Sequence, residues 1–201
     1  LKGARGCVNA GTTTEVNLTD FSRANNLNIT SVTFDDFNVR DSTFLSGGCD
    51  ADTGDRSSMA GNILSFPVPS DFIILPETIS KEPLSPAVRQ GDSQWSDIVR
   101  WSVFALFEAE ELGITKENVD DMRANSKDPR VRRMLGVEGN LNVGLGLSKD
   151  WAYNIIKAVG NYGEIYTAYM GDGPQGIRID RKGTLNELWT NGGLMYSPPF
   201  R

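Results

Sequence analysis

Residues 5–34 read RGCVNAGTTTEVNLTDFSRANNLNITSVTF, and this stretch decides the fold of the first part of the chain. Residues 5–10 and Ile29–Phe34 form two short runs, the second of them rich in β-branched side chains, and both predict strands. Between them, a threonine within residues 12–14 can cap a helix with an apolar stripe. A strand, a helix and a second strand predict a parallel pair of strands with a right-handed crossover, and therefore an α/β fold.

The sequence becomes less regular on the C-terminal side of this unit. Residues 35–45 should form a helix if the alternation continues, although their apolar periodicity is weak, and residues 49–55 are polar for a buried strand. Phe72–Leu75 is a continuous apolar run that ends at Pro76, so it predicts another strand. Prolines within residues 78–91 then indicate an extended crossing segment.

Beyond the crossing segment the pattern is typical of helices. Apolar residues between Trp95 and Phe107 fall on one helical face, and Gly113 marks the end of that helix. Asp128-Pro129 and Ser148 are helix-start signals, and residues 184–187 (TLNE) have the pattern of a capping box. We therefore predict a mostly helical second half.

The composition is that of an ordinary globular protein, with 39% hydrophobic and 23% charged residues in 201. The net charge of -6 argues against nucleic acid or an anionic membrane as the main partner. No apolar run approaches the roughly 18 residues that span a bilayer. The chain has no histidine, which removes the commonest general base and metal ligand, so most hydrolase mechanisms are disfavoured and no cofactor is predicted.

Two groups of residues invite functional interpretations that simpler ones outweigh. The four tryptophans could form a binding cage, but each lies on or beside an apolar helical stripe and we expect them to pack in the core. The arginines at 130, 132 and 133 are most simply a solvated helix face, with a docking patch for a membrane permease as the alternative. Neither group is therefore a predicted ligand site.

Three stretches resemble the family 3 solute-binding proteins of ABC importers, specifically their general L-amino-acid-binding branch. The first is residues 7–15 (CVNAGTTTE), and the second is residues 75–84 (LPETISKEPL) with its continuation 86–92 (PAVRQGD). The third is long and is the most specific; it comprises residues 94–113, 135–139 (LGVEG), 150–153 (DWAY), 160–164 (GNYGE) and 188–201 (LWTNGGLMYSPPFR).

The resemblance implies a periplasmic-binding-protein-like fold of type II, in which two α/β lobes hold an amino acid between them. Residues 1–77 would be the second, ligand-binding lobe, with a short parallel sheet flanked by helices. Residues 78–91 would cross between lobes, and residues 92–201 would be the helical C-terminal part of the first lobe and an extension. Most of the first lobe, including the arginine that pairs with the ligand α-carboxylate, has no counterpart, so the first lobe is expected to be incomplete.

The resemblance also implies the ligand contacts. Asn9 and Thr12, with Thr13 beside them, would contact the ligand at a helix N-terminus, where free N–H groups favour a carboxylate. Asp55 would pair with the ligand α-ammonium in a charge-assisted contact. The threonines also fit an ordinary N-cap, and Asp55 also fits a surface loop in which Arg56 neutralises it.

The two cysteines, Cys7 and Cys49, leave two interpretations open on count alone, a disulfide or two reduced thiols. The family pattern has a cysteine at both places. A periplasmic location, which the resemblance implies, favours the disulfide.

We therefore predict a periplasmic protein that binds polar or general L-amino acids and delivers them to the membrane permease of an ABC importer, without catalysis. The alternative is a truncated lobe that binds no ligand and pairs with another chain, which could supply the missing lobe. An enzyme on the same fold, such as a dehydratase, would need carboxylate acid–base chemistry, and Asp55 and Glu15 do not suggest a matched pair.

Overall fold

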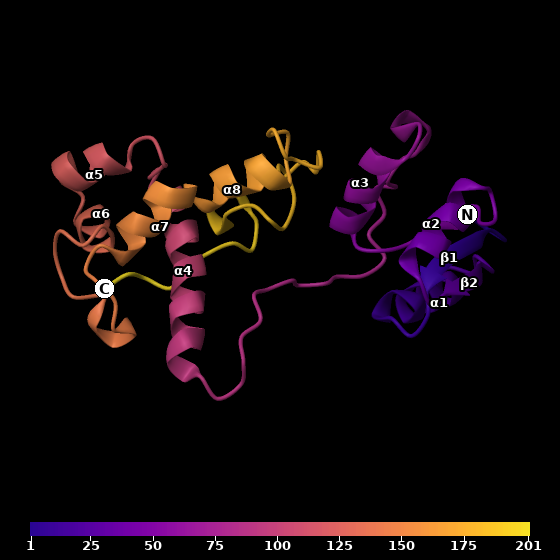
Figure 1. Cartoon of the computed structure of the whole chain (residues 1–201), viewed down its shortest axis with the longest axis horizontal. Helices are drawn as coiled ribbons and strands as arrows, with labels where there is room; N and C mark the ends of the chain where they lie inside the picture. The colour runs from indigo at the N-terminus through magenta and orange to yellow at the C-terminus, as the bar shows by residue number, and fades with distance from the viewer. The chain divides into compact units, whose positions relative to one another are not determined.

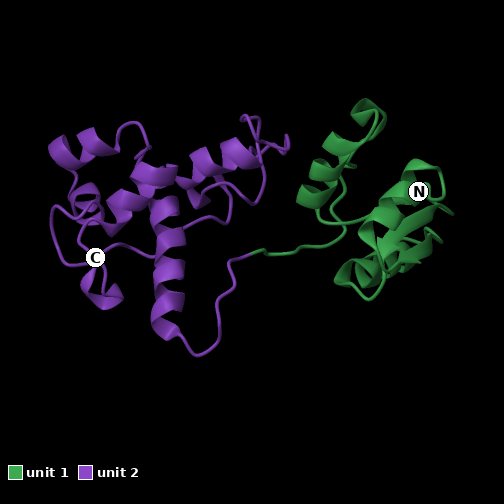
Figure 2. Cartoon of the chain, in the orientation of Figure 1, with its two compact units in different colours: residues 1–84 green, residues 85–201 purple.

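The structure, a computed structural model, describes residues 1–201 and divides into two compact units (Figure 2). Unit 1 comprises residues 1–84 and unit 2 comprises residues 85–201. Unit 1 holds all the strands. Its elements are β1 (Arg5–Asn9), α1 (Thr13–Ala24), β2 (Thr30–Phe34), α2 (Phe37–Leu45), β3 (Ala51–Asp52), α3 (Arg56–Ser65) and the 3-10 helix η1 (Pro69–Asp71).

The sheet of unit 1 is parallel, with β1 between β2 and β3. Figure 1 labels β1 and β2. Cys7 lies opposite Val32 on β2 and opposite Asp52 on β3, and the helices α1 and α2 both pack against β1 and β2. The predicted strand–helix–strand opening is therefore confirmed. Buried Cys7 and Val8 place the centre of this small core on β1.

The predicted disulfide is present and joins Cys7 of β1 to Cys49, just before β3. Both cysteines are buried, and the bridge spans 42 residues. In the chain-entropy model, closing a loop of this length stabilises the folded state by roughly 4 kcal/mol. The bridge thus fixes β3, which has only two residues, against the central strand.

The predicted strand at Phe72–Leu75 is wrong. These residues have no β-sheet partner, and Ile73 is 79% exposed. Phe72 instead packs its ring against Phe44 and Phe66. An apolar, β-branched run becomes a strand only where a neighbouring strand offers hydrogen bonds, and in unit 1 the sheet ends at β2 and β3.

Unit 2 contains only helices and irregular segments. The longest helix, α4 (Ser93–Glu111), begins at the N-cap Asp92, and Gly113 follows it with a positive φ of 67°. The helices α7 (Trp151–Val159) and α8 (Tyr162–Tyr169) both contact α4. The other elements are α5 (Val119–Asn125), α6 (Pro129–Met134), η2 (Val143–Leu145), α7 (Trp151–Val159), α8 (Tyr162–Tyr169) and η3 (Trp189–Asn191).

The core of unit 2 is one cluster of buried apolar side chains that joins α4 to α7 and the C-terminal tail. Trp151 and Phe200 stack within it, and Trp101 packs edge-on against Phe200. The buried members are Ala105, Ala109, Ile114, Val119, Val131, Met134, Leu135, Leu145, Trp151, Ala152, Ile156 and Phe200. None of the helices combines the length and hydropathy needed to span a membrane.

The prediction that all four tryptophans pack in the core is wrong for two of them. Trp95, in the first turn of α4, is 52% exposed, and Trp189 is 56% exposed on η3, where its Nε1 donates to Glu111. The capping-box pattern at residues 184–187 also starts no α-helix. Instead the Thr184 hydroxyl donates to the Arg181 carbonyl in a turn.

Candidate functional site

The residues implicated in ligand binding follow the carboxyl ends of two neighbouring strands. Asn9 is the last residue of β1, and Thr12 and Thr13 come three and four residues later. Asp55 comes three residues after the end of β3. Because β1 and β3 are parallel neighbours, their carboxyl ends lie at one edge of the sheet, which is where open α/β folds place ligands. We call this region the carboxyl edge.

The N-terminus of α1 is built as a capped helix start. The Thr12 hydroxyl donates to the Asn9 carbonyl at 2.7 Å and accepts from the Glu15 amide at 3.3 Å. The Glu15 carboxylate turns back to accept from the Gly11 amide at 2.8 Å. The amides of Thr13 and Thr14 belong to the first turn, where a helix offers no intrahelical acceptor. This end of α1 therefore presents N–H groups and a partial positive charge.

Asp55 is the N-cap of α3, is exposed and makes no side-chain capping bond. The Arg56 guanidinium donates to the carbonyls of Leu75 and Pro76, and the ion pairs of the chain include none between Arg56 and Asp55. The Asp55 carboxylate is thus not paired with a cation of the chain.

Asn9 is buried, and its side-chain amide is held at both ends. Its Nδ2 donates to the Phe34 carbonyl at 3.3 Å, and its Oδ1 accepts from Arg40 Nη1 at 2.9 Å. Arg40 belongs to α2 and is 4% exposed. Its Nε and Nη2 donate to Asp41, and its Nε lies 3.4 Å from Asp52 Oδ1. Sequence patterns alone did not predict this cluster, since a single arginine on a weakly amphipathic helix carries no signal of burial.

Asp52 is the most unusual member of the cluster. Its side chain is 1% exposed, its Oδ1 accepts from the Thr53 amide, and its Oδ2 is buried without a hydrogen-bond partner. Burial raises the pKa of Asp52 from 3.8 to about 6, although Arg40 acts in the opposite direction. A buried carboxylate with an unsatisfied oxygen is costly, so its position calls for an explanation.

A second carboxylate approaches the start of α1. Glu82 Oε1 accepts from the Thr13 hydroxyl at 3.1 Å, and Glu82 belongs to the irregular segment that ends unit 1. This contact places an acidic group of the chain itself beside the N-terminus of α1. The position therefore accommodates a carboxylate, as the partial positive charge there would favour.

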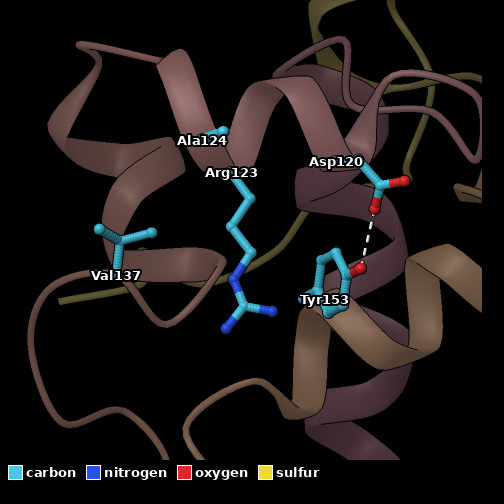
Figure 3. A pocket seen from close by; sticks show the side chains of 5 residues that line it. All are labelled: Asp120, Arg123, Ala124, Val137 and Tyr153. Carbon is cyan, nitrogen blue, oxygen red and sulfur yellow. Dashed lines mark hydrogen bonds between the residues drawn. The ribbon is translucent and has the colours of Figure 1, made fainter.

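An open hollow of about 460 Å³ lies in unit 2 and is lined by Asp120, Arg123, Ala124, Val137 and Tyr153 (Figure 3). Its polar groups are engaged with one another. Tyr153 donates to Asp120 at 2.8 Å, Lys157 also pairs with Asp120, and Arg123 covers the Tyr153 ring. These contacts tie α5 to α7 and leave no converging set of free polar groups, so the hollow is not the candidate site.

The arginines at 130, 132 and 133, expected on a solvated face, are engaged within unit 2. Arg130 pairs with Asp128, Arg132 pairs with Glu138, and Arg133 donates to the carbonyl of Phe200 in the C-terminal tail. No group of three or more cysteine, aspartate or glutamate side chains is arranged to hold a metal ion.

No protein-family model matches the chain. It is 48% identical over 201 residues to the glutamate/glutamine/aspartate/asparagine-binding protein BztA of Rhodobacter capsulatus. It is 49% identical over 203 residues to the general L-amino acid-binding periplasmic protein AapJ of Rhizobium johnstonii. Both similarities extend over the whole chain, which spans 59% and 58% of the length of these relatives.

A solved structure supports the same relationship. An ABC transporter periplasmic binding protein from Brucella ovis, with glutathione bound, matches the chain with a TM-score of 0.91 at 48% identity. The match covers all of this chain and 62% of that one. The short parallel sheet flanked by helices therefore belongs to a periplasmic-binding-protein fold, of which this chain contains a part.

Proposed function

We propose that this chain, a homologue over its whole length of the periplasmic amino-acid-binding proteins of ABC transporters, forms part of a solute-binding protein that captures L-amino acids for import. The relatives bind amino acids according to their names, and the solved relative has the same fold. The proposal places the protein in the periplasm, with a membrane permease as its partner and no catalytic step. The Cys7–Cys49 disulfide fits that oxidising compartment.

The observation that carries the proposal is that the carboxyl edge holds one negatively charged group and one set of hydrogen-bond donors. An amino acid carries an ammonium and a carboxylate on one carbon atom. The unpaired Asp55 carboxylate suits the ammonium, and the first turn of α1 at Thr12 and Thr13 offers N–H groups to a carboxylate. Asn9 lies at the end of β1, where its side-chain amide is held by the Phe34 carbonyl and by Arg40.

Calorimetric titration of the intact solute-binding protein, of which this chain is proposed to form part, with each of the twenty amino acids tests the proposal. Binding is expected for several polar amino acids, and Asp55→Asn should weaken it about 10- to 100-fold, because hydrogen bonds to charged groups contribute about 1.5–3 kcal/mol. Asp20→Asn is the matched control, since Asp20 is exposed on α1 and remote in sequence from its first turn. If no amino acid binds, or if both variants weaken binding equally, the proposal is wrong.

A second candidate function, pairing with another chain, is favoured by apolar surface on unit 2. Four large apolar side chains are each more than half exposed within twelve residues, at Leu185, Trp189, Leu194 and Tyr196. Such clustering is unusual for a surface with no partner. Mass measurement by sedimentation would show complexes in this case, whereas a monomer of 22.0 kDa at all concentrations would contradict it.

A further inference from the structure

We propose that Arg40 and Asp52 form a buried pair that positions Asn9 at the carboxyl edge, so that amino-acid binding there depends on the protonation of Asp52. This inference rests on the proposed function, because it concerns the affinity of the same site. Arg40 and Asp52 are positioning residues in this scheme, since they act on the ligand through Asn9.

Arg40 has the geometry of a connector between elements. Its Nη1 donates to Asn9 on β1, its Nη2 donates to Asp41 on α2, and its Nε lies between Asp41 and Asp52 of β3. A guanidinium is suited to this task because its donors are fixed in one plane. The orientation of Asn9 Oδ1 therefore depends on where the two carboxylates hold the guanidinium.

Asp52 is the variable member of this set. The charged groups that face it are Arg40 and Asp41, both from α2. The neighbouring groups on β1 and α3 are uncharged: Asn9 contacts Arg40, and Asn62 of α3 donates to Asp41. With Asp52 ionised, the carboxylates of Asp41 and Asp52 both attract the guanidinium, and both lie near its Nε. With Asp52 protonated, only Asp41 attracts the guanidinium.

The sign of the effect follows from this geometry. Protonation of Asp52 removes the attraction on Arg40 Nε and allows the guanidinium to shift toward Asp41, which weakens its bond to Asn9. Asn9 then keeps only the longer 3.3 Å bond to the Phe34 carbonyl. Ligand binding should therefore favour ionised Asp52, and by linkage affinity falls as the pH drops through the pKa of about 6.

The first test needs no ligand. In a ¹⁵N NMR titration of the whole chain between pH 7.5 and pH 5, the side-chain amide resonances of Asn9 should shift with an inflection near pH 6. The inflection should be absent in Asp52→Asn. It should persist in Asp50→Asn, a control two residues away whose carboxyl pairs with Arg5 and has a pKa of about 2. An Asn9 signal that does not move, or moves alike in Asp52→Asn, overturns the inference.

The second test measures affinity for a bound amino acid over the same pH range. The wild type and Asp50→Asn should bind about three- to tenfold more weakly at pH 5 than at pH 7.5, within the limit of tenfold per pH unit for one proton. Asp52→Asn should bind with the same affinity at both pH values. A wild-type affinity that is constant or rises at low pH overturns the inference. No binding at pH 7.5 contradicts the proposed function instead, and the NMR titration still decides the positioning.

Discussion

At the scale of single residues, the main feature of the molecule is the set of polar side chains at the carboxyl edge and their unequal burial. Asp55 and Thr13 are exposed, whereas Asn9 and Arg40 are buried and hydrogen-bonded to other groups of unit 1. Burying a charge is favourable only if partners compensate the lost hydration. Arg40 meets this condition, but Asp52, with one unpaired oxygen, does not.

Asp52→Asn is expected to stabilise unit 1 at pH 7. The pKa of Asp52 in the folded chain, about 6, lies above the ordinary 3.8. Between these two pH values the folded chain therefore keeps a proton that the unfolded chain has lost. The contribution of this bound proton to the free energy of unfolding is fully present below pH 3.8 and is lost as the pH rises through 6. At pH 7 Asp52→Asn should therefore raise the free energy of unfolding above that of the wild type by about 2–3 kcal/mol, at 1.36 kcal/mol per pKa unit. Near pH 4 the difference between the two proteins should vanish.

Urea unfolding followed by far-UV circular dichroism at pH 4 and pH 7 measures this difference. Asp50→Asn again serves as the control, because the carboxyl of Asp50 is exposed and has a pKa of about 2. A variant that is less stable than the wild type at pH 7 would contradict the expectation and would show that the Arg40–Asp52 pair is net stabilising.

At the scale of elements, two adjacent threonines at the start of α1 make different contacts. The Thr12 hydroxyl links the end of β1 to the third residue of the helix, so it fixes the angle at which the chain leaves the sheet. The Thr13 hydroxyl makes no such internal bond and contacts Glu82 instead. Thr12 therefore stabilises the start of the helix, and Thr13 is exposed at the carboxyl edge.

Substitution of these two threonines should separate the roles. Thr12→Ala is expected to lower the free energy of unfolding of unit 1 by about 1 kcal/mol, the usual effect of losing an N-cap. Thr13→Ala should change stability by less than about 0.5 kcal/mol, as an exposed residue would, yet weaken amino-acid binding. Denaturant unfolding and calorimetry on both variants check this, and equal losses of stability would contradict the assignment.

At the scale of the whole molecule, the two units are stabilised differently. Unit 1 has a small three-stranded sheet and contains both cysteines, whereas unit 2 has a continuous helical core and no cysteine. All four tryptophans and all five tyrosines also lie in unit 2. Reduction therefore acts directly on unit 1 alone, and tryptophan fluorescence reports on unit 2 alone.

Reduction of the Cys7–Cys49 disulfide should lower the free energy of unfolding of unit 1 by roughly 4 kcal/mol. Unit 1 contributes to the far-UV circular dichroism, so in urea titrations its transition in this signal should shift to lower urea concentration when reductant is present. The transition in tryptophan fluorescence should stay in place, which provides an internal control. A fluorescence transition that shifts by the same amount would mean that the two units unfold as one.

Local patterns in the sequence were enough to predict several of the elements. The short runs at β1 and β2, the threonine cap of α1 and the Asp128-Pro129 start of α6 each follow from a few neighbouring residues, and the structure confirms them. The resemblance to amino-acid-binding proteins also came from the sequence, since long motifs identify a family without coordinates. The proposed contacts Asn9, Thr12, Thr13 and Asp55 came from that resemblance and await the binding experiments.

Features that depend on residues far apart in the chain became visible only in the folded molecule. Phe72–Leu75 has the composition of a strand but lacks a neighbouring strand, and Trp95 lies on an apolar helical face that nothing covers at its first turn. The Asn9–Arg40–Asp52 cluster joins two strands and a helix. Burial and pairing are properties of the packed molecule, because they depend on which distant groups replace water, and no local pattern encodes them.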